Sequence, residues 1–297
     1  MADIKLYPGF LVKGKWNNNQ YKIIQLIGAG GIGQVYKVED EKKKIWALKI
    51  SRQMQSITKE YEMLKRFSHI DLVPKVNEID DFCCGNNQLY YIVMEYIDGK
   101  NLKEYIKIKP MNIKAIIGLT LLIGKAFLIL HKNNFVFGDL KLENLMIDAK
   151  NNVIRIIDLG GVTHIGSSVK EFTPLYDRAS WNMGLRRADE KYDLFSLSMF
   201  CIILLLRKNF TPGKISVDKL IKKLKDMHIS KKLVNILHKG IRQDNISFEV
   251  FLKSLEDIYI NGIDKEGNIV WDKQNFAVNV LLVSSILLFI GIMYEYL

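Results

Sequence analysis

The pattern of apolar residues changes once along the chain, and this change limits the folds available to it. Before Asp98 and Gly99 the apolar residues occur in short runs rich in Ile, Val and Tyr, separated by glycine or charged turns, as is typical of β-strands. After this turn, long apolar stretches with helical spacing follow. A chain of 297 residues is long enough for one two-lobed domain. We therefore predict an α+β fold in which a small sheet-rich lobe precedes a larger helical lobe.

The apolar runs also place the individual elements. In the first lobe we predict one helix at 57–66 and strands at 21–27, 33–38, 45–50 and 89–95. In the second lobe we predict helices at 113–133 and 191–207 and short strands at 145–148 and 153–157. The stretches 115–130 and 197–206 are strongly apolar, but the first contains Lys125 and the second is too short to span a membrane. We expect both to be buried core helices.

A glycine-rich segment, IGAGGIGQVYKV, carries Gly28, Gly30 and Gly33 in the GxGxxG spacing. Bare backbone amides in such a segment can approach phosphate oxygens closely. A dinucleotide-binding fold would need a helix to begin at the third glycine, whereas the residues after Gly33 continue as a strand. The segment therefore predicts a hairpin that covers a ligand. A glycine-rich turn without any ligand stays open as an alternative.

Lys49 lies in the apolar strand WALKI, where an ammonium group is costly unless an anionic partner neutralises it. The following helix offers two candidates, Glu60 and Glu62. The glycine-rich hairpin, the A-x-K strand at 47–49 and this helix together resemble the first lobe of protein kinases. In that family's pattern the glutamate is followed four residues later by Leu, as Glu60 is by Leu64, so we expect Glu60 to be the partner.

The most specific segment is HKNNFVFGDLKLENLMI, which resembles the kinase catalytic loop. Asp139, Lys141 and Asn144 have the family's D-x-K-x-x-N spacing. Fourteen residues after Asn144, IIDLGG resembles the magnesium-binding D-F-G motif, with Asp158 as its acid and Leu159 in place of Phe. A charged surface loop is the alternative, but apolar residues on both sides favour a loop held between buried strands.

The kinase resemblance covers 21–257 and implies a bilobal fold that binds ATP and Mg²⁺ between its lobes. It implies that Lys49 holds the α and β phosphates and that Glu60 orients Lys49. The nucleotide site that the family implies comprises Ile27, Gly28, Gly30, Gly33, Val35, Ala47, Lys49, Glu60 and Glu95.

For the transfer step, the resemblance implies that Asp139 accepts or orients the substrate hydroxyl and that Lys141 offsets charge on the phosphoryl group. Asn144 and Asp158 are the implied metal ligands. The later segment KYDLFSLSMF resembles the buried helix that anchors the large lobe of kinases. Its Asp193 is expected to bind the backbone of the catalytic loop rather than substrate.

The chain departs from the family pattern in two places. Phe137 and Gly138 stand where the family has His and Arg, so the arginine that pairs with a phosphorylated activation loop is absent, and control by that phosphorylation is not expected. The segment TPLYDRAS has Ser180 in place of the glutamate of T-P-x-Y-x-A-P-E, and no matching arginine motif follows near Asp244. We expect both halves of that ion pair to be lost together, which costs less than losing one half.

These departures leave two other functions open. One is a pseudokinase scaffold that binds nucleotide and partners without turnover, and the other is a small-molecule phosphotransferase, in which Gly often precedes the catalytic Asp. The coexistence of Asp139, Lys141, Asn144 and Asp158 favours an active protein kinase.

The acceptor is predicted from the position of Lys141. A Lys two residues after the catalytic Asp resembles the serine/threonine branch of the family, so protein substrates with Ser or Thr acceptors are expected. Thr163, Ser167, Ser168 and Thr173 are candidate autophosphorylation sites, with solvated loop residues as the alternative.

Near the C-terminus, the segment 276–294 has 19 residues without a charge. As a helix it would reach about 28 Å, close to the thickness of a bilayer's hydrocarbon core, and aromatic residues lie near both of its ends. Lys265 and Lys273 precede it and only Glu295 follows, so the positive-inside rule predicts a single-pass membrane protein with its kinase domain in the cytoplasm. A buried C-terminal core helix is the alternative.

The expected organisation is an N-terminal extension at 1–20, a kinase-like domain at 21–258, a connector at 259–275 and a transmembrane helix at 276–294. The net charge of +11 favours anionic partners, which could be acidic substrates, nucleic acid or a membrane leaflet. A Lys-rich surface that is solvated and has no such partner is the alternative. A nucleic-acid ligand is not expected, because aromatic and basic residues do not interleave.

Three cysteines are too few for a disulfide framework and fit a reducing compartment. A homodimer stays open.

Overall fold

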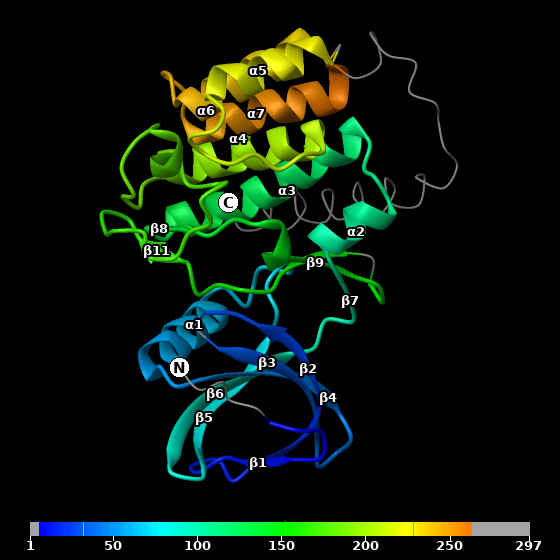
Figure 1. The fold of residues 1–297 in the computed structure, drawn as a ribbon, viewed down its shortest axis with the longest axis vertical. Coiled ribbons are helices and arrows are strands. Elements are labelled where there is room, and N and C mark those ends of the chain that lie inside the picture. Colours follow the sequence, from blue (N-terminus) through cyan, green and yellow to red (C-terminus); the bar gives the residue numbers. More distant parts are fainter. Residues whose placement is uncertain (1–5, 32, 152, 228, 263–297) are drawn as a thin grey trace. The chain divides into compact units, whose positions relative to one another are not determined.

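The computed structural model describes residues 6–31, 33–151, 153–227 and 229–262, and Figure 1 shows its fold. The described chain divides into two compact units. The first runs to Gly99 and also takes in Asp148–Lys150 and Ile154–Gly160, and the second begins at Lys100 and takes in the remaining described residues. The predicted change from a sheet-rich to a helical region at Asp98 and Gly99 is therefore confirmed.

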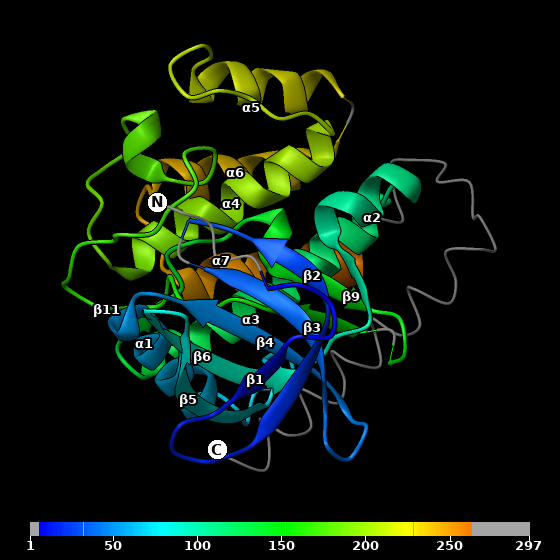
Figure 2. The same cartoon turned by 60° about the horizontal axis from the view of Figure 1, so that its bottom comes forward.

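The first unit is built on one antiparallel sheet of six strands in the order β1-β2-β3-β4-β6-β5. Figure 2 shows these strands as a single twisted sheet. The strands are β1 (Leu11–Lys13), β2 (Gln20–Ala29), β3 (Gln34–Asp40), β4 (Ile45–Ser51), β5 (Val76–Cys84) and β6 (Asn87–Glu95). Part of the predicted N-terminal extension thus forms β1, which pairs with β2 at the edge of the sheet.

Alternation of side chains along the strands divides the residues of this sheet between two faces. On one face, Tyr36 of β3 lies opposite Leu48 of β4, which lies opposite Val93 of β6, and all are buried in one apolar cluster. Lys49 points to the other face because successive residues of a strand alternate. Helix α1 (Met54–Arg66) packs against β4, β5 and β6. The register of β4 therefore directs Lys49 toward the helix that carries Glu60.

The second unit is mainly helical, with α2 (Leu102–Ile108), α3 (Ile113–Lys132), α4 (Glu190–Leu206), α5 (Val217–Asp226), α6 (Lys231–Arg242) and α7 (Phe248–Asp257). Helix α4 is almost entirely buried, as a helix that is apolar on all sides must be, and it packs against α3, α5, α6 and α7 (Figure 1). Side-chain caps fix the start of several helices: Asn112 caps α3, Asp189 caps α4, Ser216 caps α5 and Ser247 caps α7.

Short elements complete the chain. They are the strands β7 (Gly99–Asn101), β8 (Phe135–Val136), β9 (Leu145–Asp148), β10 (Val153–Ile156) and β11 (Thr163–His164), the 3₁₀ turns η1 (Leu142–Asn144) and η2 (Arg178–Trp181), and the π turn η3 (Ile258–Gly262). Strands β8 and β11 pair antiparallel, which joins the residues before the predicted catalytic loop to the segment after the D-L-G motif.

One described helix, α3, is long and apolar enough to cross a membrane, and most of it is buried inside the helical unit. Its burial against α4 and α7 agrees with the prediction of a core helix for 115–130. The predicted transmembrane helix at 276–294 lies outside the described residues, as does most of the connector at 259–275. All three cysteines are free, as expected.

The predicted elements agree with the structure to within a few residues, and the main omissions are β1, β5 and the helices α5 to α7. Strand β5 was missed because acidic residues interrupt its apolar run: Glu78 and Asp80 are buried there by hydrogen bonds to a distant segment. Asp80 accepts from the backbone amides of Trp16 and Asn17, which precede the domain's first predicted strand.

The contact of α6 with α4 and α7 depends on Gly240. A Cβ atom at this position would collide with Ser198 Oγ on α4 and would lie 2.7 Å from the Phe251 ring on α7. The Gly240→Val variant is expected to lower the free energy of unfolding by about 1–3 kcal/mol, because the helices must move apart. Asn235→Val places the same side chain at an exposed position of α6 and should change the free energy of unfolding by about 0.5 kcal/mol or less. Urea denaturation of both variants measures the difference, and equal effects would show that the contact tolerates the larger residue.

Candidate active site

The glycine-rich segment forms the hairpin between β2 and β3 that the sequence predicted. Gly28 pairs with Val35 across the hairpin, and the amide of Gly30 donates to the carbonyl of Gly33 at 2.9 Å. A Cβ atom at Gly33 would collide with the carbonyl oxygen of Ile50, so only glycine lets β3 approach β4 this closely. A Cβ atom at Gly30 would meet nothing within 4 Å. Open space at the hairpin tip is what the approach of a ligand to these amides requires.

Lys49, Glu60 and Asp158 form an ionic cluster within the first unit. Lys49 Nζ lies 2.6 Å from Glu60 Oε2 and 3.5 Å from Asp158 Oδ1. The side chains of Lys49 and Glu60 are 9% and 2% exposed, whereas that of Asp158 is 30% exposed. Glu62 is exposed, so the choice of Glu60 over Glu62 as the lysine's partner agrees with the structure. The cation is thus fixed between one buried and one accessible carboxylate.

The D-L-G segment is also held by hydrogen bonds of its own. Lys59, next to Glu60 on α1, donates from Nζ to the carbonyl oxygen of Gly160 at 2.7 Å. The amide of Gly160 donates to Asp158 Oδ1 at 2.9 Å, which restricts the orientation of that carboxylate. Helix α1 therefore positions both the lysine's carboxylate partner and the backbone beside Asp158.

Of the remaining predicted nucleotide residues, Ile27, Val35 and Ala47 lie on β2, β3 and β4, whereas Glu95 is engaged elsewhere. Its carboxylate accepts from Arg155 Nη1 at 3.1 Å and Nη2 at 2.5 Å. Arg155 is buried and also donates to the carbonyl oxygen of Val73 at 3.2 Å. The side chain of Glu95 is thus used in a structural pair, and the sequence analysis missed Arg155.

In the second unit, Asp139, Lys141 and Asn144 come together in the loop between β8 and β9. Lys141 Nζ forms an ion pair with Asp139 Oδ2, and Thr173 Oγ1 donates to Asp139 Oδ1 at 2.9 Å. Asn144 Nδ2 donates to the carbonyl oxygen of Asp139 at 3.1 Å. Asp139 is only 6% exposed. A nearly buried carboxylate oriented on both oxygens is a suitable group to orient a hydroxyl or take its proton.

The backbone of this loop is held by Asp193, which is fully buried in α4. Asp193 Oδ2 accepts from the amide of Phe137 at 2.8 Å, and Oδ1 accepts from the amide of Gly138 at 3.2 Å. His131 Nε2 on α3 lies 2.9 Å from Asp193 Oδ2. The predicted role of Asp193 as a backbone anchor is therefore the one that the geometry supports.

Gly138, which replaces the family's arginine, has a backbone reason for its identity. Its φ is +81°, in the left-handed region that favours glycine, and a Cβ atom there would lie 2.7 Å from the carbonyl oxygen of Gly161. A Cβ atom at Gly161 would in turn lie 2.8 Å from Asp139 Cβ. The loop and the segment after the D-L-G motif thus pack backbone against backbone.

The candidate autophosphorylation residues differ in their surroundings. Thr163 Oγ1 donates to the carbonyl oxygen of Gly161 at 2.8 Å, and the hydroxyl of Thr173 is bound to Asp139. Ser167 and Ser168 are exposed. The two serines are therefore the accessible members of the set, whereas Thr173 belongs to the surroundings of Asp139.

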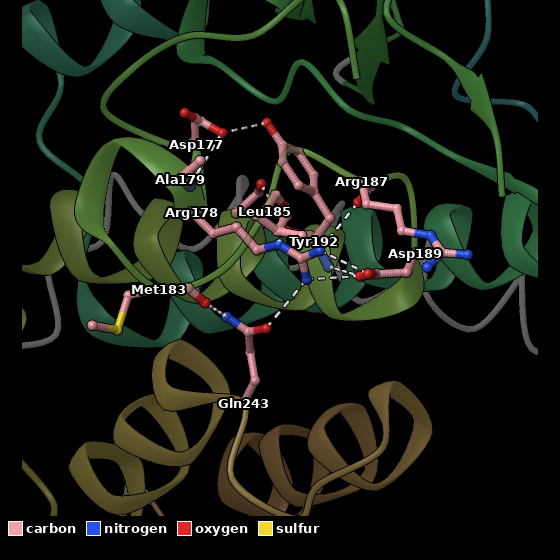
Figure 3. Close-up of polar contacts among 10 residues, drawn as sticks. Asp177, Arg178, Ala179, Met183, Leu185, Arg187, Asp189, Tyr192 and Gln243 are labelled. Atoms are coloured by element: carbon pink, nitrogen blue, oxygen red, sulfur yellow. Dashed lines mark hydrogen bonds and ion pairs between the residues drawn. The ribbon is translucent and has the colours of Figure 1, made fainter. Parts of the chain in front are cut away.

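Arg178 occupies the part of the chain where the family's glutamate–arginine pair was expected to be lost (Figure 3). Its guanidinium is bidentate to Asp189, with Nη1 to Oδ1 at 2.8 Å and Nη2 to Oδ2 at 2.7 Å, and it also reaches Gln243 Oε1 at 3.2 Å. Arg178 Nε donates to the carbonyl oxygen of Leu185 at 2.7 Å. The sequence pattern indicated no ion pair here, and the structure has a different one, with its positive charge on the TPLYDRAS segment at 173–180 (the activation segment).

The neighbouring Asp177 is also fully buried. Burial favours the neutral acid, but hydrogen bonds from Ser180, Arg186 and Tyr192 outweigh burial and hold the pKa of Asp177 below its ordinary value. Burial and the charge of Asp177 raise the pKa of Tyr192 above its ordinary value. This segment is thus tied to the start of α4 by charged groups that the family pattern did not reveal.

The side chain of Arg178 is 5% exposed, so its removal leaves a gap in the packing and deprives Asp189, Gln243 and two backbone carbonyls of their donor. Arg178→Met is expected to lower the free energy of unfolding by about 2–4 kcal/mol. Arg178→Lys should lower the free energy of unfolding somewhat less, because lysine keeps the positive charge but lacks the planar guanidinium group. Arg187→Met at an exposed position of the same segment is the matched control, and we expect a change of about 0.5 kcal/mol or less. Chemical denaturation compares the three, and an equal loss for Arg178→Met and Arg187→Met would contradict an anchoring role.

Comparison with known proteins supplies the family. The model of the protein kinase domain matches residues 21–257. The chain is 33% identical over 257 residues to serine/threonine-protein kinase YabT of Bacillus subtilis (strain 168), an alignment that covers 85% of this chain and 75% of that protein.

Two further relatives match over smaller parts of their own length. Serine/threonine-protein kinase PrkC of the same organism is 34% identical over 164 residues, covering 52% of this chain and 24% of PrkC. Probable serine/threonine-protein kinase CPE1738 of Clostridium perfringens (strain 13 / Type A) is 25% identical over 262 residues, covering 85% of this chain and 36% of that protein. The family model covers most of the chain and agrees with the clusters around Lys49 and Asp139: the chain belongs to the protein kinase family, as a serine/threonine protein kinase.

Proposed function

We propose that this kinase transfers the γ-phosphate of ATP to Ser and Thr hydroxyls of protein substrates while it is anchored to a membrane by residues 276–294. The arrangement around Asp139 is the observation that best supports the proposed phosphate transfer. Its carboxylate is nearly buried, is bound by Lys141 and Thr173, and belongs to a loop that α4 holds through Asp193.

Asp139 is proposed to orient the substrate hydroxyl and to accept its proton. A carboxylate can do this only if it is held in one orientation, and the contacts of Lys141 and Thr173 with its two oxygens supply that restraint. The ammonium group of Lys141 is placed to offset negative charge on the phosphoryl group in transfer. Because Thr173 shares Asp139 with the proposed acceptor, we propose that it helps to distinguish Ser and Thr from other acceptors.

The donor atoms of the chain suit ATP and Mg²⁺. Mg²⁺ prefers oxygen ligands, is usually held by one or two protein groups together with phosphate oxygens, and neutralises charge that develops on those phosphates. Asp158 has an accessible carboxylate, and the nitrogen of the Asn144 amide is used on Asp139, which leaves the amide oxygen as the ligand atom. Among the described residues there is no cluster of three or more His, Cys, Asp or Glu side chains that could hold a metal without such help. Lys49 is proposed to bind the α and β phosphates.

An active enzyme is favoured over a pseudokinase scaffold by the support of the loop. The missing His and Arg of the family pattern leave the orientation of Asp139 to other groups. Asp193 binds the amides of Phe137 and Gly138, and Gly138 adopts the backbone conformation that the loop needs. The replacement of His and Arg by Phe137 and Gly138 therefore removes a means of control by phosphorylation, whereas the support of Asp139 is retained.

The catalytic role is tested by Asp139→Asn, which keeps the size of the side chain but removes its basicity. We expect transfer of labelled phosphate to a protein acceptor to fall by roughly 10²–10⁴-fold, because the hydroxyl is no longer assisted. ATP binding should be retained. Asp257→Asn, at an exposed position of α7, is the control and should leave transfer unchanged. Absent transfer in the unmodified chain, with ATP still bound, would favour the pseudokinase instead.

The membrane part of the proposal is supported by the sequence alone, since 276–294 lies outside the described residues. An uncharged run of 19 residues is long enough to span a bilayer as a helix, and the Lys residues of the preceding connector favour a cytoplasmic kinase domain. A homodimer remains a prediction.

A chain that ends at Asn275 tests the anchor. We expect the full chain to remain with membranes in alkaline carbonate and the shortened chain to appear in the soluble fraction, because the uncharged run has been removed. Transfer activity of the shortened chain serves as the control for folding. An active shortened chain that stays in the carbonate-resistant fraction would contradict anchoring by 276–294.

A further inference from the structure

The net positive charge of the chain is concentrated in one part of the helical unit. Residues 207–242 contain eleven Lys or Arg residues and two Asp or Glu residues, a net charge of +9 out of +11 for the whole chain. This segment includes α5 and α6, which are consecutive and pack against each other. In Figures 1 and 2, α5 lies at the outer end of the helical unit.

The two helices separate their apolar and basic residues. Helix α5 buries Val217, Leu220, Ile221 and Leu224 against the unit, and α6 buries Leu233, Val234, Ile236, Leu237, Gly240 and Ile241. Exposed lysines occupy the rest of both helices: Lys219, Lys222, Lys223 and Lys225 on α5, and Lys231, Lys232 and Lys239 on α6. We call these seven lysines the basic face.

The charge of the basic face is not neutralised within the fold. Among the residues that the structure describes, no Asp or Glu lies within 4.0 Å of any of the seven, and the ion pair of this segment joins Arg242 to Asp218 instead. Like charges crowded on one surface repel one another unless an anionic partner is present. The packing of α5 and α6 therefore leaves exposed, unneutralised lysines on two neighbouring helices open to a partner.

We propose that the basic face binds the anionic leaflet of the membrane to which the kinase is anchored. This inference rests on the anchor proposed above. A tether of residues 263–275 spans at most about 45 Å, so an anchored helical unit stays close to the bilayer surface. Polybasic surfaces near an anchor are attracted to anionic lipid headgroups.

The composition of the face favours diffuse attraction to a charged surface over recognition of individual bases or phosphates, and the proposed anchor places a lipid surface within reach. Apart from Arg242, which is paired with Asp218, the Lys and Arg residues of α5 and α6 are all lysines, which act as point charges and do not form the planar, bidentate contacts of arginine with single phosphates. Helices α5 and α6 contain no Phe, Tyr or Trp on which bases could stack. Diffuse attraction to many headgroups needs neither feature. The anchor then holds the kinase at the membrane, and the basic face determines which side of the helical unit is turned toward it.

The test uses the full chain in nanodiscs of phosphatidylcholine alone or mixed with phosphatidylglycerol. The readout is the rate at which each lysine is chemically labelled, measured by mass spectrometry. We expect Lys231 and Lys232 to be labelled roughly threefold or more slowly in the anionic discs, and high salt to abolish the difference. Exposed Lys42, Lys43 and Lys44 in the other unit should label at the same rate in both discs.

Two matched variants separate position from total charge. Lys222→Gln/Lys223→Gln/Lys225→Gln should remove the slower labelling of Lys231 and Lys232, whereas Lys42→Gln/Lys43→Gln/Lys44→Gln loses the same charge and should preserve it. Equal labelling of the unmodified chain in both discs would overturn the proposal. Slower labelling with duplex DNA in neutral discs but not with phosphatidylglycerol would also overturn it and assign the face to nucleic acid.

The anchor is judged separately, by co-elution with neutral discs. If the chain leaves neutral discs but Lys231 and Lys232 are labelled slowly on anionic vesicles, the result supports membrane binding by the basic face and contradicts the anchor. If the chain co-elutes with neutral discs and its labelling does not depend on the lipid, the result supports the anchor and contradicts membrane binding by the basic face.

Discussion

The buried carboxylate of Asp193 is the group on which the geometry of the proposed catalytic loop depends. A charge in the interior of a helical unit must be compensated, and here the compensating groups are the amides of Phe137 and Gly138 together with His131. Because α4 is buried on all sides, Asp193 cannot shift without disturbing the helices around it. This deeply buried helix is thereby connected directly to the backbone beside Asp139.

Two buried cations extend the same principle to other parts of the chain. Lys49 is held by Glu60 in the sheet-rich unit, and Arg178 is held by Asp189 in the helical unit. Each pair links two elements that also pack against each other, β4 with α1 and η2 with α4. Burying such pairs adds little net stability, but removing one partner is costly because the other remains buried or loses its orientation. The pairs therefore specify one arrangement of their elements more than they increase stability.

The departures from the family pattern have local physical causes. Gly138 has a positive φ and lies against Gly161, so the replaced arginine and the close backbone packing belong together. Arg178 takes over the attachment of the activation segment, with Asp189 and Gln243 as its partners. This kinase thus keeps the D-x-K-x-x-N spacing of its family at 139–144 while it anchors the surrounding backbone in another way.

The sequence by itself determined the change from strands to helices at Asp98 and Gly99, the hairpin at Gly30, the partnership of Lys49 with Glu60 and the grouping of Asp139, Lys141 and Asn144. These features depend on local periodicity or on spacings of a few residues, which the sequence states directly. It did not reveal the use of Glu95 by Arg155, the burial of Asp80 in β5 or the pairing of Arg178 with Asp189 and Gln243. Only the tertiary structure decided these, because a buried charge selects its partner among groups that packing brings together from distant parts of the chain.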